Sequence, residues 1–157
     1  MKSPEQIREK FMTALELCLP EQLHARVFLR ASQKCEILAS DTQFVCILAE
    51  LINNCTEKPA EHIEVNVSID FNESQKIFHM SVEDNIIYEA KKAQEFVRIL
   101  NSHRQIKTAD KRPDIMKPLT YGVGIVMARN YLAGHDGRLV YRKSDDHRII
   151  AEANWKK

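Results

Sequence analysis

All four glycines of the chain lie within sixteen residues, and the first two are spaced to bind a phosphate group. Gly122 and Gly124 lead into an apolar helical run, residues 125–132. Glycine permits positive φ and lets backbone N–H groups approach an anion at a helix N-terminus, so this arrangement suits the phosphates of a ligand. A tight turn before a packed helix is the alternative interpretation. Gly134 and Gly137 then mark the end of the helix and a turn.

Polar side chains gather at two other points of the sequence. Glu50 and Asn54 are four residues apart in a segment with helical periodicity, so both project from one side of the helix, beside its apolar stripe. Asp84 and Asn85 come at the end of a stretch that alternates like a strand. Taken alone, Glu50 and Asn54 are typical of a solvated helix face. The order of helix, strand end and glycine pair along the chain favours a ligand site.

Periodicity predicts the elements that must position these side chains. Residues 62–71 alternate without interruption, which predicts a strand with one apolar face, and a turn at 72–74 follows. Asp41 is the expected N-cap of the helix that carries Glu50 and Asn54. Residues 21–33 fit helix or strand, and we favour a helix followed by a short strand at 35–39. The other expected elements are helices at 3–17, 41–56, 90–101 and 125–133, and strands at 77–83, 138–143 and 147–155.

Composition limits the classes of function. A chain of 157 residues with 44% hydrophobic residues is expected to form a single core. The net charge of +1 gives no global field for nucleic acid or a membrane surface, and no segment resembles a signal peptide or a membrane span. The cysteines and histidines lack metal-ligand spacing, so we expect no zinc site and no disulfide framework, and a cytoplasmic setting. The segments around Cys18, Cys46 and Cys55 look like core.

The three motifs resemble those of the GHKL ATPase superfamily, whose members have the Bergerat fold, and most of all the ATP-binding catalytic domain of sensor histidine kinases. Residues 50–54, Glu-Leu-Ile-Asn-Asn, resemble the N box, and residues 82–85, Val-Glu-Asp-Asn, resemble the G1 box. Residues 121–129, Tyr-Gly-Val-Gly-Ile-Val-Met-Ala-Arg, resemble the G2 box, and the turn at 133–139 is similar to that of histidine kinases. The resemblance covers roughly residues 35–155.

The resemblance implies a role for each matched side chain. Asn54 would coordinate the Mg²⁺ that bridges the phosphates of ATP or ADP, in keeping with the preference of Mg²⁺ for oxygen ligands. Glu50 would be the catalytic carboxylate that activates a water or hydroxyl group. Asp84, with Asn85 beside it in the nucleotide site, would accept a hydrogen bond from the adenine amino group.

The resemblance also assigns the phosphate end of the site. Gly122 and Gly124 would hold the phosphates of the nucleotide. Residues 102–120 lack periodicity, contain two prolines and carry five lysines and arginines against two aspartates. They would form a basic, mobile ATP lid whose cations stabilise phosphate charge.

The G1 box is degenerate, because Ile86 and Ile87 replace the glycines that the family has after the aspartate. Positive φ at either position would strain a β-branched residue by about 1–2 kcal/mol, so we expect this loop to take another path and partly fill the adenine site. Three functions stay open. They are an ATP-binding histidine-kinase-like module of a bacterial signalling pathway, a nucleotide-free pseudokinase or adaptor that docks partner proteins, and an anti-sigma-type serine protein kinase with Glu50 as its base.

The resemblance implies an α+β fold, a two-layer α/β sandwich in which a mixed sheet carries its helices on one face. We expect residues 1–34 to form an N-terminal helical segment and residues 35–157 the ATP-binding domain. The expected partners are adenine nucleotide, a signalling protein (a response regulator, kinase or sigma-factor-like protein) and, through the N-terminal helices, a second copy of the chain. We expect no nucleic acid or membrane partner. His24 is expected to be a helix or interface histidine rather than a phosphoacceptor.

Overall fold

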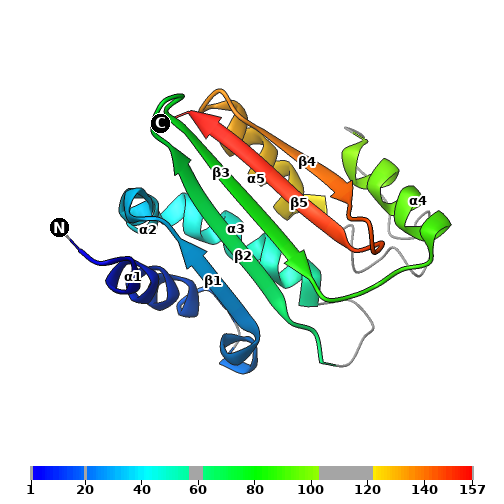
Figure 1. Ribbon diagram of the computed structural model, residues 1–157, viewed down its shortest axis with the longest axis horizontal. Helices are drawn as coiled ribbons and strands as arrows, with labels where there is room; N and C mark the ends of the chain where they lie inside the picture. Colours follow the sequence, from blue (N-terminus) through cyan, green and yellow to red (C-terminus); the bar gives the residue numbers. More distant parts are fainter. Residues whose placement is uncertain (1, 20, 57–61, 103–121, 157) are drawn as a thin grey trace.

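A computed structural model describes residues 2–19, 21–56, 62–102 and 122–156. Five strands within these ranges form one sheet in the order β1-β2-β3-β5-β4 (Figure 1). None of the helices in these ranges is long and apolar enough to cross a bilayer. The elements are α1 (Pro4–Glu16), η1 (Glu21–Arg26), β1 (Val27–Ala31), η2 (Gln33–Cys35), α2 (Glu36–Ala39), α3 (Thr42–Thr56), β2 (Val65–Asn72), β3 (Ile77–Asp84), α4 (Ala90–Asn101), α5 (Gly122–Ala133), β4 (Arg138–Lys143) and β5 (Ile149–Lys156).

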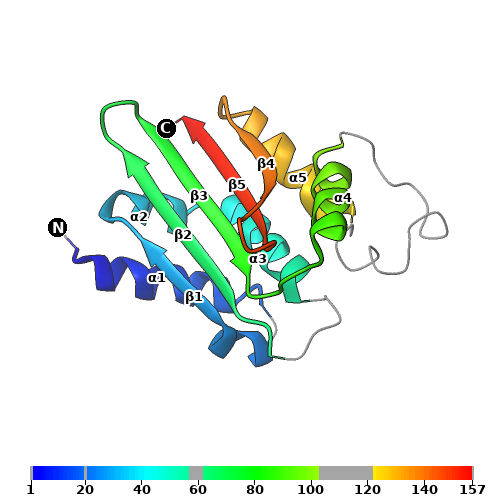
Figure 2. The ribbon, with the colours of Figure 1, turned by 45° about the vertical axis from the view of Figure 1, so that its right-hand side comes forward.

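The sheet is mixed and is covered by helices on one face. β1 runs parallel to β2, and the other neighbouring strands are antiparallel. Val65, Val67 and Ile69 alternate inward along β2, whereas Asn66 and Asp70 face solvent. Figures 1 and 2 show α3 and α5 behind the sheet, with α1 along the β1 edge and α4 beside the β4 edge. This arrangement confirms the expected α+β sandwich with helices on one face.

Phe44, near the start of α3, joins the helices to each other and to the sheet. Its ring centroid lies 6.0 Å from that of Phe11 in α1, 6.1 Å from that of Tyr131 in α5 and 5.4 Å from that of Trp155 in β5. Asp41 accepts the Phe44 N–H at 3.1 Å, as expected of an N-cap, and also accepts the Tyr131 hydroxyl at 2.7 Å. Burial and this hydrogen bond raise the pKa of Tyr131 above its usual value.

The expectation for residues 21–39 was wrong in the order of its elements. Val27–Ala31, which we favoured as helix, forms β1, and the expected strand at 35–39 is the end of η2 followed by helix α2. The run Val27-Phe28-Leu29 fits both periods locally, and it becomes a strand because β2 offers a parallel partner far along the sequence. Residues 1–34 thus supply a strand of the sheet, and three buried side chains of α1 (Ile7, Phe11 and Leu15) belong to the common core.

The end of α5 differs in detail from the expected glycine stop. Asp136, not a glycine, has the positive φ of 52° that ends the helix. Its N–H donates to the Ala133 carbonyl, and the Gly137 N–H donates to the Leu132 carbonyl at 2.7 Å, which is the Schellman pattern. Gly137 is required for another reason. A Cβ there would lie inside contact distance of the Asn154 carbonyl and of the Trp155 backbone in β5.

We predict that Gly137→Ala lowers the free energy of unfolding by about 1–3 kcal/mol, since the added methyl group must push β4 away from β5. Gly134→Ala is the matched control. A Cβ at that position would meet only the Tyr131 and Asn130 carbonyls, at 3.4 and 3.7 Å, so its effect should stay within about 1 kcal/mol. Urea denaturation of both variants measures the difference. Equal effects would contradict the close approach of Gly137 to β5.

Candidate functional site

Asn54 and Asp84 are the two polar or charged side chains that are buried among the residues the structure describes. Asn54 is 7% exposed and Asp84 is fully buried. Asn54 lies near the end of α3, and Asp84 is the last residue of β3, on the same face of that strand as Val82. The helix-covered side of the sheet therefore contains one amide and one carboxyl side chain that the sequence assigned to the nucleotide site.

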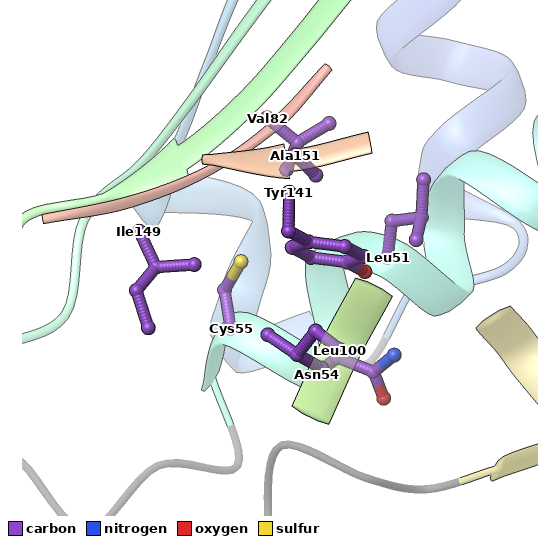
Figure 3. Close-up of a pocket in the computed structure, with 8 residues that line it drawn as sticks. All are labelled: Leu51, Asn54, Cys55, Val82, Leu100, Tyr141, Ile149 and Ala151. Carbon is purple, nitrogen blue, oxygen red and sulfur yellow. The ribbon is translucent and has the colours of Figure 1, made fainter. Parts of the chain in front are cut away.

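Asn54 lines a small cavity between α3, α4 and the sheet (Figure 3). The cavity has a volume of about 20 Å³, which is room for about one water molecule. The ring of Tyr141 lies at the centre of the group. A purine cannot enter a space of this size unless side chains move. The lining residues are Leu51, Asn54, Cys55, Val82, Leu100, Tyr141, Ile149 and Ala151.

The Asn54 amide is partly unsatisfied. Its Nδ2 atom is buried and has no hydrogen-bond partner among the described residues. A buried donor without a partner costs about 1–3 kcal/mol of stability. Such a cost is a reason to expect a ligand group at this position, because a bound acceptor would remove it.

Asp84 shapes the loop that contains Ile86 and Ile87. Its Oδ1 accepts the Ile86 N–H at 2.9 Å, which fixes the turn after β3. Ile86 is half-buried against the core, whereas Ile87 is 66% exposed. Neither isoleucine has positive φ, so the loop takes an unstrained path. Neither isoleucine is among the residues that line the cavity, which include Leu100, Tyr141 and Ile149.

Glu50 and Asn85 are placed differently from Asn54 and Asp84. Glu50 is exposed on α3, although it lies one helical turn before the buried Asn54. Asn85 is exposed and holds the chain that leads into β2. Its Nδ2 donates to the His62 carbonyl and its Oδ1 accepts the Glu64 N–H, both at 3.0 Å.

Gly122 and Gly124 lie in the first turn of α5, which begins at Gly122 rather than at the expected residue 125. Their peptide groups are thus helical, and no glycine in the described ranges has positive φ. Orphan N–H groups of a first helical turn are available to an anion. The expected lid, 102–120, lies outside the described residues apart from Ser102.

Two hydrogen-bonding side chains that sequence reasoning missed hold the last turn of α4 against the cavity. Asn101 donates to the Tyr141 carbonyl at 2.7 Å and accepts the Tyr141 N–H at 2.8 Å, so one amide group satisfies both backbone groups at this point of β4. Arg129 of α5 donates to the Leu100 carbonyl. Together they hold the backbone of the last turn of α4 against β4 and α5, where Leu100 lines the cavity. The contacts join residues 40 and 29 positions apart, and no local pattern signals them.

Arg129 also brings a positive charge to this side of the cavity. Its Nε atom is buried without a hydrogen-bond partner among the described residues, as is Nδ2 of Asn54. Burial raises the pKa of Tyr141, a nearby Cys55 thiol acts in the same direction, and the Arg129 guanidinium acts against them. The described residues contain no group of three or more His, Cys, Asp and Glu side chains that could hold a metal ion.

Comparison with solved structures shows what fold this is. The catalytic domain of histidine kinase ThkA, in a nucleotide-free form, matches with a TM-score of 0.59 and 12% identity, over 95% of this chain and 91% of that chain. The mycobacterial sensor histidine kinase MprB matches with a TM-score of 0.55 and 9% identity, over 95% and 93% of the two chains. The chain has the fold of histidine kinase catalytic domains, which confirms the expected GHKL-like architecture. No family model and no curated protein matches the sequence significantly.

We predict that Asn101→Ala lowers the free energy of unfolding by about 1–3 kcal/mol, because two backbone groups of Tyr141 lose their partner. Hydrogen exchange should show faster exchange of the Tyr141 amide. The Arg142 amide, which points toward β5 in an antiparallel ladder, should keep its protection. Asn130→Ala, on the exposed side of α5, is the matched control. Unchanged exchange at Tyr141 would show that Asn101 does not hold this strand.

Proposed function

We propose that this chain is a histidine-kinase-like nucleotide-binding module that takes an adenine nucleotide with Mg²⁺ beside α3. The observation that carries the proposal is the burial of Asn54 and Asp84 in an otherwise apolar interior. Burying an amide and a carboxyl group costs stability unless they serve a partner, and both are residues that the GHKL resemblance assigns to the nucleotide. The fold of the histidine kinase catalytic domains supports the same assignment.

The chemistry of these groups suits the two ends of the ligand. The Asp84 carboxylate is an acceptor for the adenine amino group, which guanine does not present at that position. Asn54 supplies an amide that can serve the phosphates through Mg²⁺, which accepts a single protein oxygen when phosphates and waters complete its shell. The first turn of α5, with Gly122 and Gly124, offers N–H groups to the phosphates. If phosphoryl transfer follows, the exposed Glu50 is the proposed catalytic carboxylate.

Binding requires the cavity to open, because about 20 Å³ does not admit a purine. Leu100 is the side chain to move, since it comes from α4 at the sheet edge rather than from the sheet itself. The free energy of breaking the Asn101 and Arg129 contacts must be subtracted from the binding free energy. We therefore propose weak binding, and a cytoplasmic signalling role with a protein partner such as a response regulator or kinase.

The filled cavity favours a second candidate function. A chain in which Leu100, Tyr141 and Ile149 occupy the adenine region would keep the fold without the ligand, as an adaptor that docks partner proteins. On this proposal no ligand accepts a hydrogen bond from Nδ2 of Asn54 or from Nε of Arg129. Nucleotide titration separates the two functions.

We predict that isothermal titration with Mg·ADP detects weak binding to the full chain, and that Asp84→Asn weakens it by about 1–3 kcal/mol, because an acceptor of the base becomes a mismatched amide. Asp70→Asn removes the same charge on the open sheet face and is the matched control. Leu100→Ala should strengthen binding by enlarging the cavity, although it lowers stability by about 2–5 kcal/mol. Circular dichroism must show that each variant is folded.

Asn54→Leu tests the cost of the unpaired amide. It should raise the melting temperature of the ligand-free protein, because it removes a buried donor at similar volume, and should lose the Mg²⁺-dependent part of nucleotide binding. If neither the wild type nor Leu100→Ala binds Mg·ADP, the adaptor function replaces the nucleotide-binding one.

A further inference from the structure

Two cysteine thiols lie side by side on the surface, within segments that the sequence led us to expect in the core. Cys18 follows α1 and Cys46 lies on α3, both are exposed, and their Sγ atoms are 3.9 Å apart. The segment around Cys46 does lie in the core, but Cys46 itself does not. The neighbours of Cys46 that face the core are Phe44, Val45, Ile47 and Leu48, which leaves Cys46 on the outer side of the helix.

The packing of α1 on α3 holds the two thiols together. Phe11 and Phe44 form an edge-to-face ring pair between these helices, with an interplanar angle of 76°. The Cys18 N–H donates to the Leu15 carbonyl at 2.9 Å, so Cys18 sits in the turn that closes α1. The pair is therefore made by tertiary structure, since its members are 28 residues apart in the sequence.

We propose that Cys18 and Cys46 form an oxidation site at which a peroxide converts the two thiols into an intramolecular disulfide. A disulfide bond is about 2 Å long, and rotation of two exposed side chains can close the present separation of 3.9 Å. The site does not depend on nucleotide binding.

The reaction with hydrogen peroxide balances in two steps. One cysteine attacks a peroxide oxygen as its thiolate, the O–O bond breaks, and the cysteine becomes a sulfenic acid while the other oxygen leaves as water. The second thiolate then attacks the sulfenic sulfur, the S–S bond forms, and the remaining oxygen leaves as water. Two thiols lose two electrons and two protons, and the peroxide is reduced to two waters.

The two oxidation states differ in what they do to the fold. Slight burial and the neighbouring Cys46 raise the pKa of the Cys18 thiol. The disulfide would fix the end of α1 to α3, the helix that carries Glu50 and Asn54, and would restrict the unfolded chain between residues 18 and 46. The oxidised protein should therefore melt at a higher temperature than the reduced one.

Treatment of the full chain with hydrogen peroxide, followed by alkylation and non-reducing peptide mass spectrometry, tests the proposal. We expect a monomer that has lost two free thiols and yields a Cys18–Cys46 linked peptide, with a melting temperature that rises on oxidation and returns with a reductant. Cys18→Ser and Cys46→Ser should each abolish the linked peptide and the shift. Cys55→Ser, which removes a partly buried cysteine elsewhere on α3, should keep both.

Three results would overturn the proposal. They are a linked peptide that contains Cys35 or Cys55 instead, a disulfide-bonded dimer as the main product, and oxidation of Cys18 or Cys46 to sulfinic acid without any cross-link.

Discussion

Only one face of the five-stranded sheet is apolar, and the need to bury that face determines the rest of the structure. β2 and β3 turn their buried side chains to the same side, and α3 and α5 cover them there. Phe44 stands where these helices and β5 meet, and the Asp41 side chain connects the start of α3 with Tyr131 of α5. A polar group at this interface must find a partner, because water has been removed from it.

This constraint explains why buried polar side chains mark the candidate site. Asn54 and Asp84 sit within the helix-covered layer, whereas the other sequence-predicted side chains, Glu50 and Asn85, face solvent. Asp84 has a structural task as well, since it fixes the turn at Ile86. For Nδ2 of Asn54 the structure shows no hydrogen-bond partner among the described residues, and burying this donor costs stability. Tyr141 and Leu100 pack closely in the same layer and line the small cavity beside Asn54, so the proposed nucleotide would have to displace part of this apolar core.

The sequence predicted those elements whose pattern is local. The alternation at 62–71 and the Asp41 cap located β2 and α3, and Asp84 was placed correctly at the end of β3. Val27–Ala31 was missed because a run this short becomes a strand only through its pairing with β2. The contact of Asn101 with Tyr141 was not predictable either. The contact depends on how distant segments pack, which no spacing along the chain records. The exposure of Cys46 follows instead from its position on the outer side of α3, between buried neighbours.

The Asn101 amide has a consequence for behaviour in concentrated solution. β4 is an edge strand of the sheet. The backbone groups of an exposed edge strand can pair with a strand of another polypeptide chain. At Tyr141 the backbone N–H and carbonyl are already hydrogen-bonded to the Asn101 side chain, as they would be to a neighbouring strand. α4 thereby protects this point of the sheet edge from pairing with another chain. Any motion that moves α4 away from β4 would expose these backbone groups and favour aggregation until the helix returns.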